Sequence, residues 1–140
     1  MAEQRERFRV AWVDTDTGGR IHFTAAFRWA EVTETSLYRR LGMLRGELGG
    51  YPRRHVEADF HRVLVFEDEV EVRLWVERVG TTSITYRWEV TKDGERAIDG
   101  THTVVRVGAD GRPLALADDV RALLETDGSG AGGIRTPGPA

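Results

Sequence analysis

Apolar side chains alternate with polar ones in five stretches of the chain, and this period of two residues is typical of half-buried β-strands. In the first stretch, Phe8, Val10 and Trp12 share one side of the expected strand. The other four stretches cover residues 56–61, 69–76, 84–90 and, less regularly, 97–107. The sequence therefore predicts five strands, one at the start of the chain and four in its second half.

Between the first two of these strands, apolar positions recur every three or four residues from Thr24 to Leu41, which predicts an amphipathic helix. Its apolar stripe would carry Phe27, Ala30, Glu34, Leu37, Tyr38 and Leu41. Thr24 is the expected N-cap, and Gly42 is the expected left-handed residue at the other end. A helix of this span is about 27 Å long, comparable to a nine-residue strand.

These elements predict an α+β fold in which a five-stranded antiparallel sheet wraps around one long central helix. Asp93-Gly94 is a two-residue hairpin signal, and short links make the last four strands an antiparallel meander. Only the long helix is large enough to cover the apolar face of the sheet. A short helix is expected at 117–125. We assign residues 1–126 to one domain and residues 127–140, rich in Gly and Pro, to a flexible C-terminal tail.

The composition narrows the classes of function. The 140 residues carry a net charge of −3 and no cysteine, which argues against broad nucleic-acid binding and excludes disulfides and thiolate metal sites. His55, His61 and His102 lack metal-binding spacing, so no metal is expected. No apolar run is long enough for a membrane span, and the charged N-terminus lacks a secretory signal pattern. We therefore expect a cytoplasmic protein.

The segment Asp14–Gly19, with the sequence DTDTGG, interrupts the strand pattern just before the helix. Its two glycines allow a sharp turn and the close approach of a ligand. The first amides of the following helix point back at this turn with a partial positive charge, so a carboxylate and an oxyanion-binding group would stand together. The same residues also suit a turn that only caps the helix. Spacing alone does not choose between the two interpretations.

The run VDTDTGGRIHFTAAFRW resembles the opening motif of the 4-hydroxybenzoyl-CoA thioesterase family and of the related Tol–Pal-associated acyl-CoA thioesterases. The shared pattern is Asp-x-Asp-x-x-Gly, then an aromatic residue four positions later, then the helix. These families have the hotdog fold, a sheet wrapped around a central helix, and the resemblance implies this fold for the chain. It covers about residues 7–125.

The resemblance implies an acyl-CoA thioesterase, which hydrolyses a thioester to a free acid and coenzyme A. Asp16 would be the catalytic carboxylate, as nucleophile or general base, and the backbone amide of Phe23 would stabilise the oxyanion. The Tol–Pal-associated branch has a histidine where Phe23 stands. His22 lies one position earlier, so a part for His22 in catalysis is left open. Coenzyme A enters only as part of the substrate, and no cofactor is implied.

Six further residues are expected to contact the substrate: Gly19, Phe27, Thr82, Ser83, Arg54 and Arg78. The glycine closes the catalytic motif, and the phenylalanine lies on the helix where it would line an acyl pocket or fill the core. By resemblance, the Thr-Ser pair lies in a turn near the pantetheine arm. The two arginines flank expected strand ends and are chosen for the phosphates of coenzyme A.

Glu34 is a rival catalytic carboxylate, because it lies in the apolar stripe of the helix, where an unpaired charge is costly. Another branch of hotdog thioesterases uses a carboxylate on this helix. The alternative is that Glu34 reaches a subunit interface and pairs with one of the many arginines. We favour this alternative, since Asp16 already supplies the carboxylate.

Two other functions stay open at this stage. One is a non-catalytic module that binds acyl-CoA or acyl-carrier protein, and the other is a hotdog dehydratase or hydratase in which His22 would be essential. In each case the edges of a small sheet invite pairing with a second copy. We expect a homodimer or homotetramer with its site at the subunit interface, acting on an acyl-CoA or acyl-carrier-protein thioester.

Overall fold

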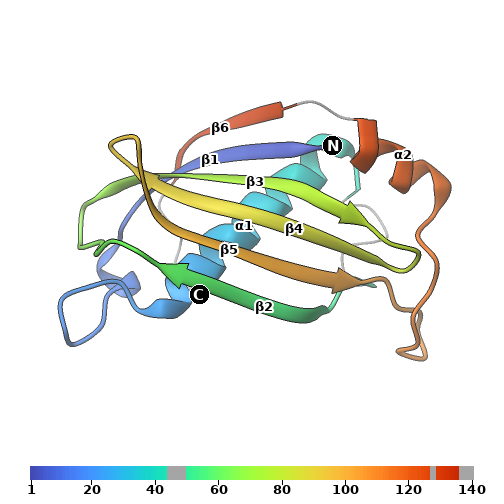
Figure 1. Ribbon diagram of the computed structural model, residues 1–140, viewed down its shortest axis with the longest axis horizontal. Helices are drawn as coiled ribbons and strands as arrows, with labels where there is room; N and C mark the ends of the chain where they lie inside the picture. The colour runs from blue at the N-terminus through green and yellow to red at the C-terminus, as the bar shows by residue number, and fades with distance from the viewer. Residues whose placement is uncertain (44–49, 127–128, 136–140) are drawn as a thin grey trace.

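The computed structural model describes residues 1–43, 50–126 and the backbone of 129–135. One sheet runs through it in the order β2-β5-β4-β3-β1-β6 (Figure 1). Its strands are β1 (Glu3–Arg9), β2 (Arg53–Phe60), β3 (Glu69–Val79), β4 (Ser83–Lys92), β5 (Glu95–Val105) and β6 (Ser129–Arg135). The helices are α1 (Phe23–Leu41), α2 (Asp118–Thr126) and the 3-10 turn η1 (Trp12–Asp14).

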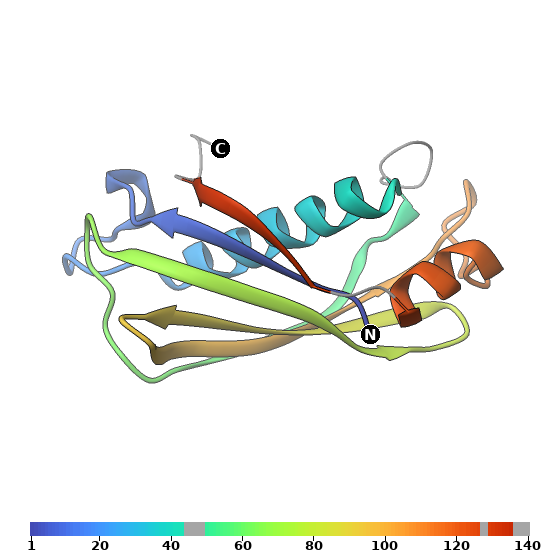
Figure 2. The same ribbon diagram turned by 90° about the horizontal axis from the view of Figure 1, so that it is seen from above.

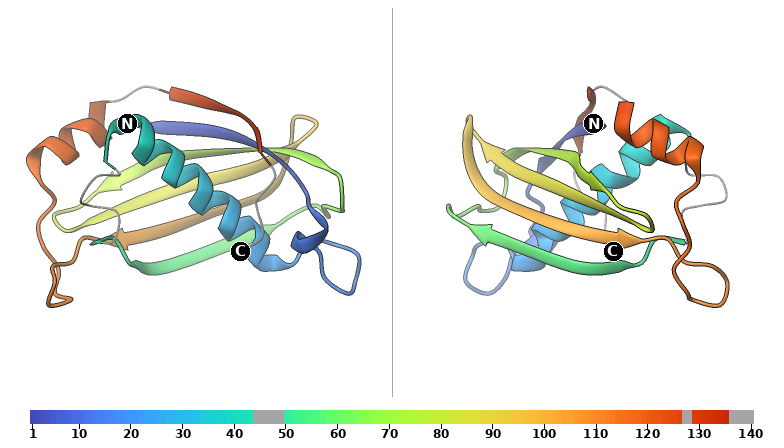
Figure 3. Two further views of the ribbon diagram at one scale, coloured as in Figure 1. Left: turned by 180° about the vertical axis from the view of Figure 1, so that it is seen from behind. Right: turned by 45° about the vertical axis from the view of Figure 1, so that its right-hand side comes forward.

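The five expected strands form an antiparallel sheet that curves around α1, so the predicted fold class is confirmed. Within the series β2, β5, β4, β3 and β1, each strand is antiparallel to the next. Figure 2 shows α1 on one face of this sheet, and Figure 3 shows the sheet bending towards it. The short helix α2 lies at one end. The chain thus has one long central helix and, as expected, one short helix near its C-terminal end.

A sixth strand is the main difference from the expected fold. Residues Ser129–Arg135 form β6, which pairs in parallel with β1, whereas the sequence analysis placed all of 127–140 in a flexible tail. A strand of mostly small residues pairs through its backbone and gives no apolar alternation to detect. It also covers the outer edge of β1, whose N–H and C=O groups otherwise remain unpaired. The remaining residues of the expected tail lie outside the described part.

The first strand begins earlier than expected. Its buried positions are Gln4, Glu6 and Phe8, while Trp12 lies beyond the strand and is 76% exposed. Gln4 and Glu6 are polar although they are buried, so the N-terminal half of the strand shows no apolar alternation. The side chain of Gln4 is hydrogen-bonded, because the Nε of Arg40 donates to its Oε1 at 2.8 Å.

The first residue of α1 also differs from the expected one. The helix starts at Phe23, and its N-cap is His22 rather than Thr24, since the His22 Nδ1 accepts from the Thr24 amide at 3.3 Å. At the other end Gly42 has a φ of 75°, as expected for a left-handed terminating glycine. Within the expected apolar stripe Ala30, Glu34, Leu37 and Tyr38 are buried, whereas Phe27 and Leu41 are only half-buried.

The edge strand β2 is left largely uncovered. Its residues Val56 and Phe60 lie opposite His102 and Ile98 of β5, on the face that α1 covers elsewhere. They are nevertheless 48% and 46% exposed, although their β5 neighbours are buried. In the described part of the chain, no strand pairs with the outer edge of β2. This edge therefore presents both free backbone groups and apolar side chains.

Candidate active site

Asp16 lies on a tight loop that enters α1. An antiparallel bridge joins Thr15 to Ile21, and the Asp16 amide donates to the Arg20 carbonyl at 2.8 Å. Gly19 turns the chain with a φ of 80°, a conformation that favours glycine. The Asp16 side chain is exposed, and its Oδ1 accepts from the Gly18 amide at 2.8 Å. Its Oδ2 has no hydrogen-bond partner among the described residues.

Asp14, the other acid of the motif, is fully buried and holds this loop on the helix. Its Oδ1 accepts from the Arg28 guanidinium and its Oδ2 from the Ala11 amide, each at 2.8 Å. Its backbone carbonyl accepts from the His22 amide at 2.7 Å. All of these contacts are internal to the fold. Of the two aspartates, only Asp16 presents a carboxylate to a ligand.

The start of α1 supplies a free hydrogen-bond donor. The Ala25 amide donates to the His22 carbonyl and the Thr24 amide to the His22 ring. No acceptor within the described part of the chain pairs with the Phe23 amide, so it is available to an incoming oxygen. The Phe23 ring is 60% exposed and stacks on His22 at 4.6 Å between centroids.

His22 is engaged with the helix rather than with Asp16. Its Nδ1 lies 2.7 Å from the Thr24 hydroxyl and caps the first turn of α1. His22 therefore stabilises the start of α1 as its N-cap. The imidazole is exposed and its other nitrogen, Nε2, has no hydrogen-bond partner among the described residues.

A surface hollow of about 250 Å³ adjoins the loop. Its walls are Arg20, Ile21, Phe60, His61, Arg62, Val63 and Leu64. The Ile21 amide donates to the Leu64 carbonyl at 3.0 Å, which joins this wall to the Asp16 loop. On the helix nearby, Phe27 is half-buried and meets Trp88 edge-to-face. The Asp16 end of the molecule thus combines an exposed carboxylate, the free Phe23 amide and a hollow with apolar walls.

Glu34 is buried in a different place, at the centre of a hydrogen-bond cluster. Only 3% of it is exposed. Its Oε1 accepts from Arg53 at 2.6 Å and lies 2.8 Å from the Nε2 of His102, and its Oε2 accepts from the Tyr38 hydroxyl at 2.5 Å. The Tyr86 hydroxyl in turn donates to the Tyr38 oxygen at 2.9 Å. We call these five residues the Glu34 cluster.

Electrostatics keep Glu34 ionised. Burial, the largest single influence, raises the pKa of Glu34, but the hydrogen bonds and charges of His102 and Arg53 together lower it below the ordinary value. Burial raises the pKa of Tyr38 and Tyr86 well above the usual range, so both phenols stay protonated and can donate. An ionised carboxylate with three donors around it is poorly placed to attack a carbonyl or to activate water. This geometry favours an ion pair with arginine, and the pair forms within one chain.

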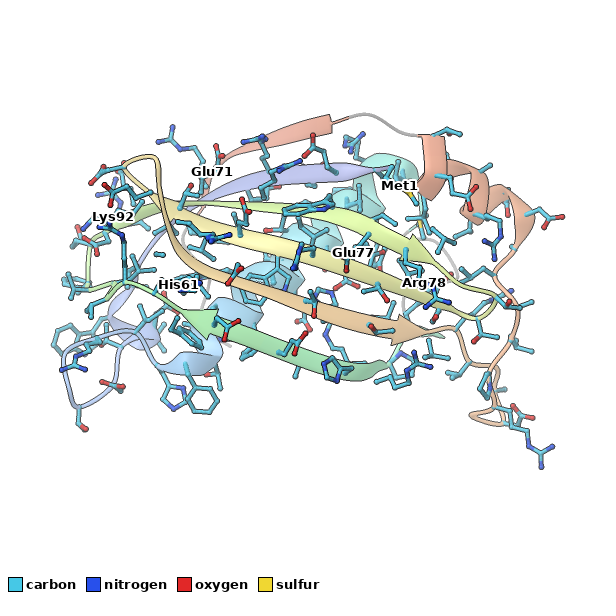
Figure 4. All side chains as sticks on the ribbon, viewed as in Figure 1. Met1, His61, Glu71, Glu77, Arg78 and Lys92 are labelled. Atoms are coloured by element: carbon cyan, nitrogen blue, oxygen red, sulfur yellow. The ribbon has the colours of Figure 1, made fainter. Side chains whose placement is uncertain are left out.

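The residues expected to bind coenzyme A lie far from Asp16 in the same chain. Thr82 and Ser83 form the turn between β3 and β4, where the Gly80 amide donates to the Ser83 carbonyl at 2.7 Å. Arg78 lies at this end of the sheet, opposite the end that holds His61 (Figure 4). Arg54 is the second residue of β2 and is exposed. The length of α1, about 28 Å for its 19 residues, separates the two ends.

The sequence analysis did not single out Arg53 or His102 as partners of Glu34. The signals available were a carboxylate in an apolar stripe and a histidine at an alternating position of the fifth strand. Neither signal identifies the partner residue, because the contacts join residues that are separated in the sequence by 19 and by 68 positions. Within the described ranges, no three His, Asp or Glu side chains are grouped to hold a metal ion. No helix there is long and apolar enough to cross a membrane.

An antiparallel sheet wrapped around one helix, with a carboxylate on the loop that enters the helix, places the protein among hotdog-fold enzymes. Residues 18–98, more than half of the chain, match the family described as "Thioesterase superfamily", and the chain belongs to this family. The expected class, thioester hydrolase, is confirmed at this level. The match begins two residues after Asp16 and does not include that carboxylate.

A named relative and a solved structure are similar to this chain. The 1,4-dihydroxy-2-naphthoyl-CoA hydrolase of Prochlorococcus marinus (strain NATL1A) is 24% identical over 99 residues, 62% of this chain and 66% of that protein. A predicted thioesterase from Bacillus stearothermophilus is 23% identical with a TM-score of 0.81, over 97% of this chain and 99% of its own.

A third relative was solved with a ligand. It is a thioesterase from Thermus thermophilus complexed with coenzyme A and Zn, 26% identical with a TM-score of 0.79, over 86% of this chain and 90% of its own. The resemblance is therefore confirmed for the superfamily. None of these three relatives carries the name 4-hydroxybenzoyl-CoA thioesterase.

Proposed function

We propose that this protein hydrolyses an acyl-CoA thioester and that Asp16 is the catalytic carboxylate. The observation that carries the proposal is the pairing of an exposed carboxylate, whose Oδ2 accepts no hydrogen bond from the described residues, with the open helix start at Phe23. Gly19 permits the turn that allows both to meet one ligand. The Asp14–Arg28 ion pair supports the proposal because it holds the loop in place.

The reaction needs only groups of this chain and water. The thioester carbonyl oxygen accepts from the Phe23 amide, which stabilises the negative charge that develops on it. Asp16 then either attacks the carbonyl carbon, giving an anhydride that water cleaves, or removes a proton from the attacking water. In both routes the C–S bond breaks, the thiolate of coenzyme A takes up a proton, and the acid is released. His22 holds the first turn of the helix in the geometry that this step requires.

The site is proposed to span two subunits. In one chain, Thr82, Ser83, Arg54 and Arg78 lie at the opposite end of the sheet from Asp16. A two-fold axis beside the free edge of β2 would pair the β2 strands of two copies in antiparallel. The Asp16 end of each subunit would then lie next to the Arg78 end of its partner. The same pairing covers the apolar side chains that β2 exposes. We propose a homodimer on this basis, and a homotetramer made of two such dimers remains an expectation from the sequence.

Charge along β2 favours one register for this pairing. If Val56 lies opposite its own copy, His55 faces Glu57 of the partner subunit on both sides of the axis. Shifting the register by one residue pair places Glu57 opposite itself, and like charges directly opposite each other destabilise a sheet. The favoured register places Arg53 beside the partner's Asp59, next to the hollow that adjoins the partner's catalytic loop.

The acyl group is proposed to be aromatic and carried on coenzyme A or an acyl-carrier protein. The name of the Prochlorococcus relative supports an aromatic acyl-CoA. The half-buried Phe27, in edge-to-face contact with Trp88, supports an aromatic wall near the helix start. The cytoplasm remains the expected location.

The decisive experiment measures thiol release from a panel of aliphatic and aromatic acyl-CoAs. Asp16→Asn is expected to lower kcat/KM by about 10²-fold or more, because amides neither attack nor take up protons. The exposed loop residue Asp110, changed to Asn, is the matched control and should retain full activity. Full activity in Asp16→Asn would overturn the mechanism. Binding without thiol release from any thioester would favour a non-catalytic module, and hydration activity that depends on His22 would favour a hydratase.

A further inference from the structure

The turn between β3 and β4 is held in place by the part of the chain that follows β5. Three successive carbonyl oxygens of this turn accept hydrogen bonds from that part. The pairs are Gly80 with the Arg121 guanidinium at 2.6 Å, Thr81 with the Leu116 amide at 2.9 Å and Thr82 with the Arg106 amide at 2.8 Å. Helix α2, which carries Arg121, lies at this end of the sheet (Figure 1). The turn is therefore fixed from its carbonyl side.

Arg121 is the one side chain among these three donors. Its Nη2 donates to the Gly80 carbonyl, and its Nη1 lies 3.4 Å from the carboxylate of Glu125. Helix α2 is anchored on the sheet by Val120 and Leu124, which are both buried. A hydrogen bond from a charged donor is stronger than one between neutral groups. Arg121 therefore acts mainly on the turn, while the two apolar residues hold the helix.

With these carbonyls occupied, the turn has donors left for a ligand. The amides and hydroxyls of Thr81 and Thr82 have no acceptor within residues 1–43, 50–126 and 129–135. Thr81 is exposed and Thr82 is half-buried. The turn is also tight, because a Cβ built on Gly80 would lie 2.7 Å from the Ser83 Oγ. Free N–H and O–H groups beside the exposed Arg78 suit a ligand that carries phosphates.

We propose that Arg121 is a positioning residue for thioester hydrolysis. It holds the β3–β4 turn so that the free donors of Thr81 and Thr82 meet the coenzyme A part of a substrate whose carbonyl lies at the partner subunit's Asp16. The inference rests on the proposed hydrolysis and on the β2 pairing, which brings the Arg78 end of one subunit to the Asp16 end of the other. Arg121 itself touches neither the substrate nor the reacting atoms. Without its hydrogen bond the turn gains freedom, and ordering the turn then weakens binding of the ligand.

The test compares two benzoyl thioesters, one of coenzyme A and one of N-acetylcysteamine, which keeps the thiol end of coenzyme A and lacks its phosphates and nucleotide. The carrier preference is the kcat/KM for the coenzyme A ester divided by that for the N-acetylcysteamine ester. Arg121→Gln is expected to lower this preference about tenfold, through a higher KM for the coenzyme A ester with kcat nearly unchanged. Hydrolysis of the N-acetylcysteamine ester should stay the same, whereas a general loss of structure would slow both reactions.

Two further variants complete this test. Glu125→Gln is the matched control, because it changes the other partner of Arg121 and leaves the hydrogen bond to Gly80 in place, so the carrier preference should stay the same. Arg121→Lys keeps a cation that can donate to one carbonyl, so the preference should fall by only about threefold. This variant tests the inference even where Arg121→Gln folds poorly, and thermal unfolding shows which variants are folded. An unchanged preference in every folded Arg121 variant, or an equal loss for both esters, would overturn the inference.

A second measurement separates this inference from the proposed hydrolysis. Coenzyme A itself is titrated into the wild type, Asp16→Asn and Arg121→Gln by calorimetry. The first two should bind it equally, and Arg121→Gln should bind it about tenfold more weakly. This pattern in a protein that releases no thiol from any thioester would refute only the hydrolysis. Thiol release by the wild type together with equal affinities in all three proteins would refute only the positioning role of Arg121.

Discussion

At the scale of single residues, two neighbouring aspartates have opposite environments. Asp14 is fully buried between Arg28 and the Ala11 amide, whereas Asp16 is exposed and bonded on one oxygen only. Asp14 therefore holds the loop in place, whereas Asp16 is free for the contact with substrate that we propose. The division arises because the loop turns back at Gly19 and only the second acid lies on its outer side.

We therefore predict that a change at Asp14 lowers stability, whereas a change at Asp16 lowers activity and leaves stability nearly unchanged. Asp14→Asn removes the charge opposite Arg28 and should lower the free energy of unfolding by about 1–3 kcal/mol. Asp16→Asn changes an exposed carboxylate and should alter it by less than about 0.5 kcal/mol. Urea denaturation measures both, and thiol release measures activity. Equal destabilisation by the two changes would contradict the division.

At the scale of elements, the packing of β5 against β4 depends on one glycine. A Cβ built on Gly100 would lie 2.4 Å from Cζ2 of Trp88 and 2.6 Å from the Glu57 carbonyl. Trp88 is fully buried and Phe27 of α1 meets it edge-to-face. The central strands, the edge strand and the helix therefore meet at a position where only glycine fits.

Gly100→Ala is expected to force the indole of Trp88 and the edge strand apart. Overpacking of this kind costs about 1–3 kcal/mol of unfolding free energy. Thermal unfolding and tryptophan fluorescence would report the shift. Gly94→Asn provides the matched control, because Gly94 is exposed in a hairpin, has open space around it and a φ that Asn tolerates. A Gly100→Ala protein as stable as the wild type would contradict the close packing.

At the scale of the whole molecule, the residues proposed for one site lie at two ends of the chain's sheet. The Asp16 loop lies at one end, and the residues expected to hold coenzyme A lie at the other, as Figure 4 shows for His61 and Arg78. The uncovered edge and exposed apolar side chains of β2 lie between the two groups. Assembly and activity are therefore expected to depend on each other.

Placing a charge on that edge should separate the subunits. Val56→Asp puts a carboxylate at the proposed two-fold axis, opposite its own copy, and should shift the mass in solution from twice 15.7 kDa to 15.7 kDa. The rate of thiol release should fall as the dimer dissociates. Leu114→Asp, at an exposed apolar residue in a loop, is the control and should leave both unchanged. A dimeric and fully active Val56→Asp protein would exclude β2 as the interface.

The sequence by itself determined the layers of the fold and the position of the loop. Period-two and helical spacing predicted five strands and α1, and Gly42 marked the helix end, because these signals act within a few residues of the chain. The same spacing signals missed features of the fold that depend on contacts between residues far apart in the sequence. Gln4 and Glu6 are buried without apolar character, and the sequence of β6, which pairs with β1, shows no apolar alternation.

Only the tertiary structure decided which polar groups meet. It placed Asp14 against Arg28, and joined Glu34 to Arg53 and His102, from three separate elements. A sequence shows that a carboxylate in an apolar stripe must be paired, but the partner follows from how strands and helix cross in space. The reason is physical: hydrophobic spacing repeats along the chain, whereas a buried charge is satisfied by whichever donors the packing brings within about 3 Å.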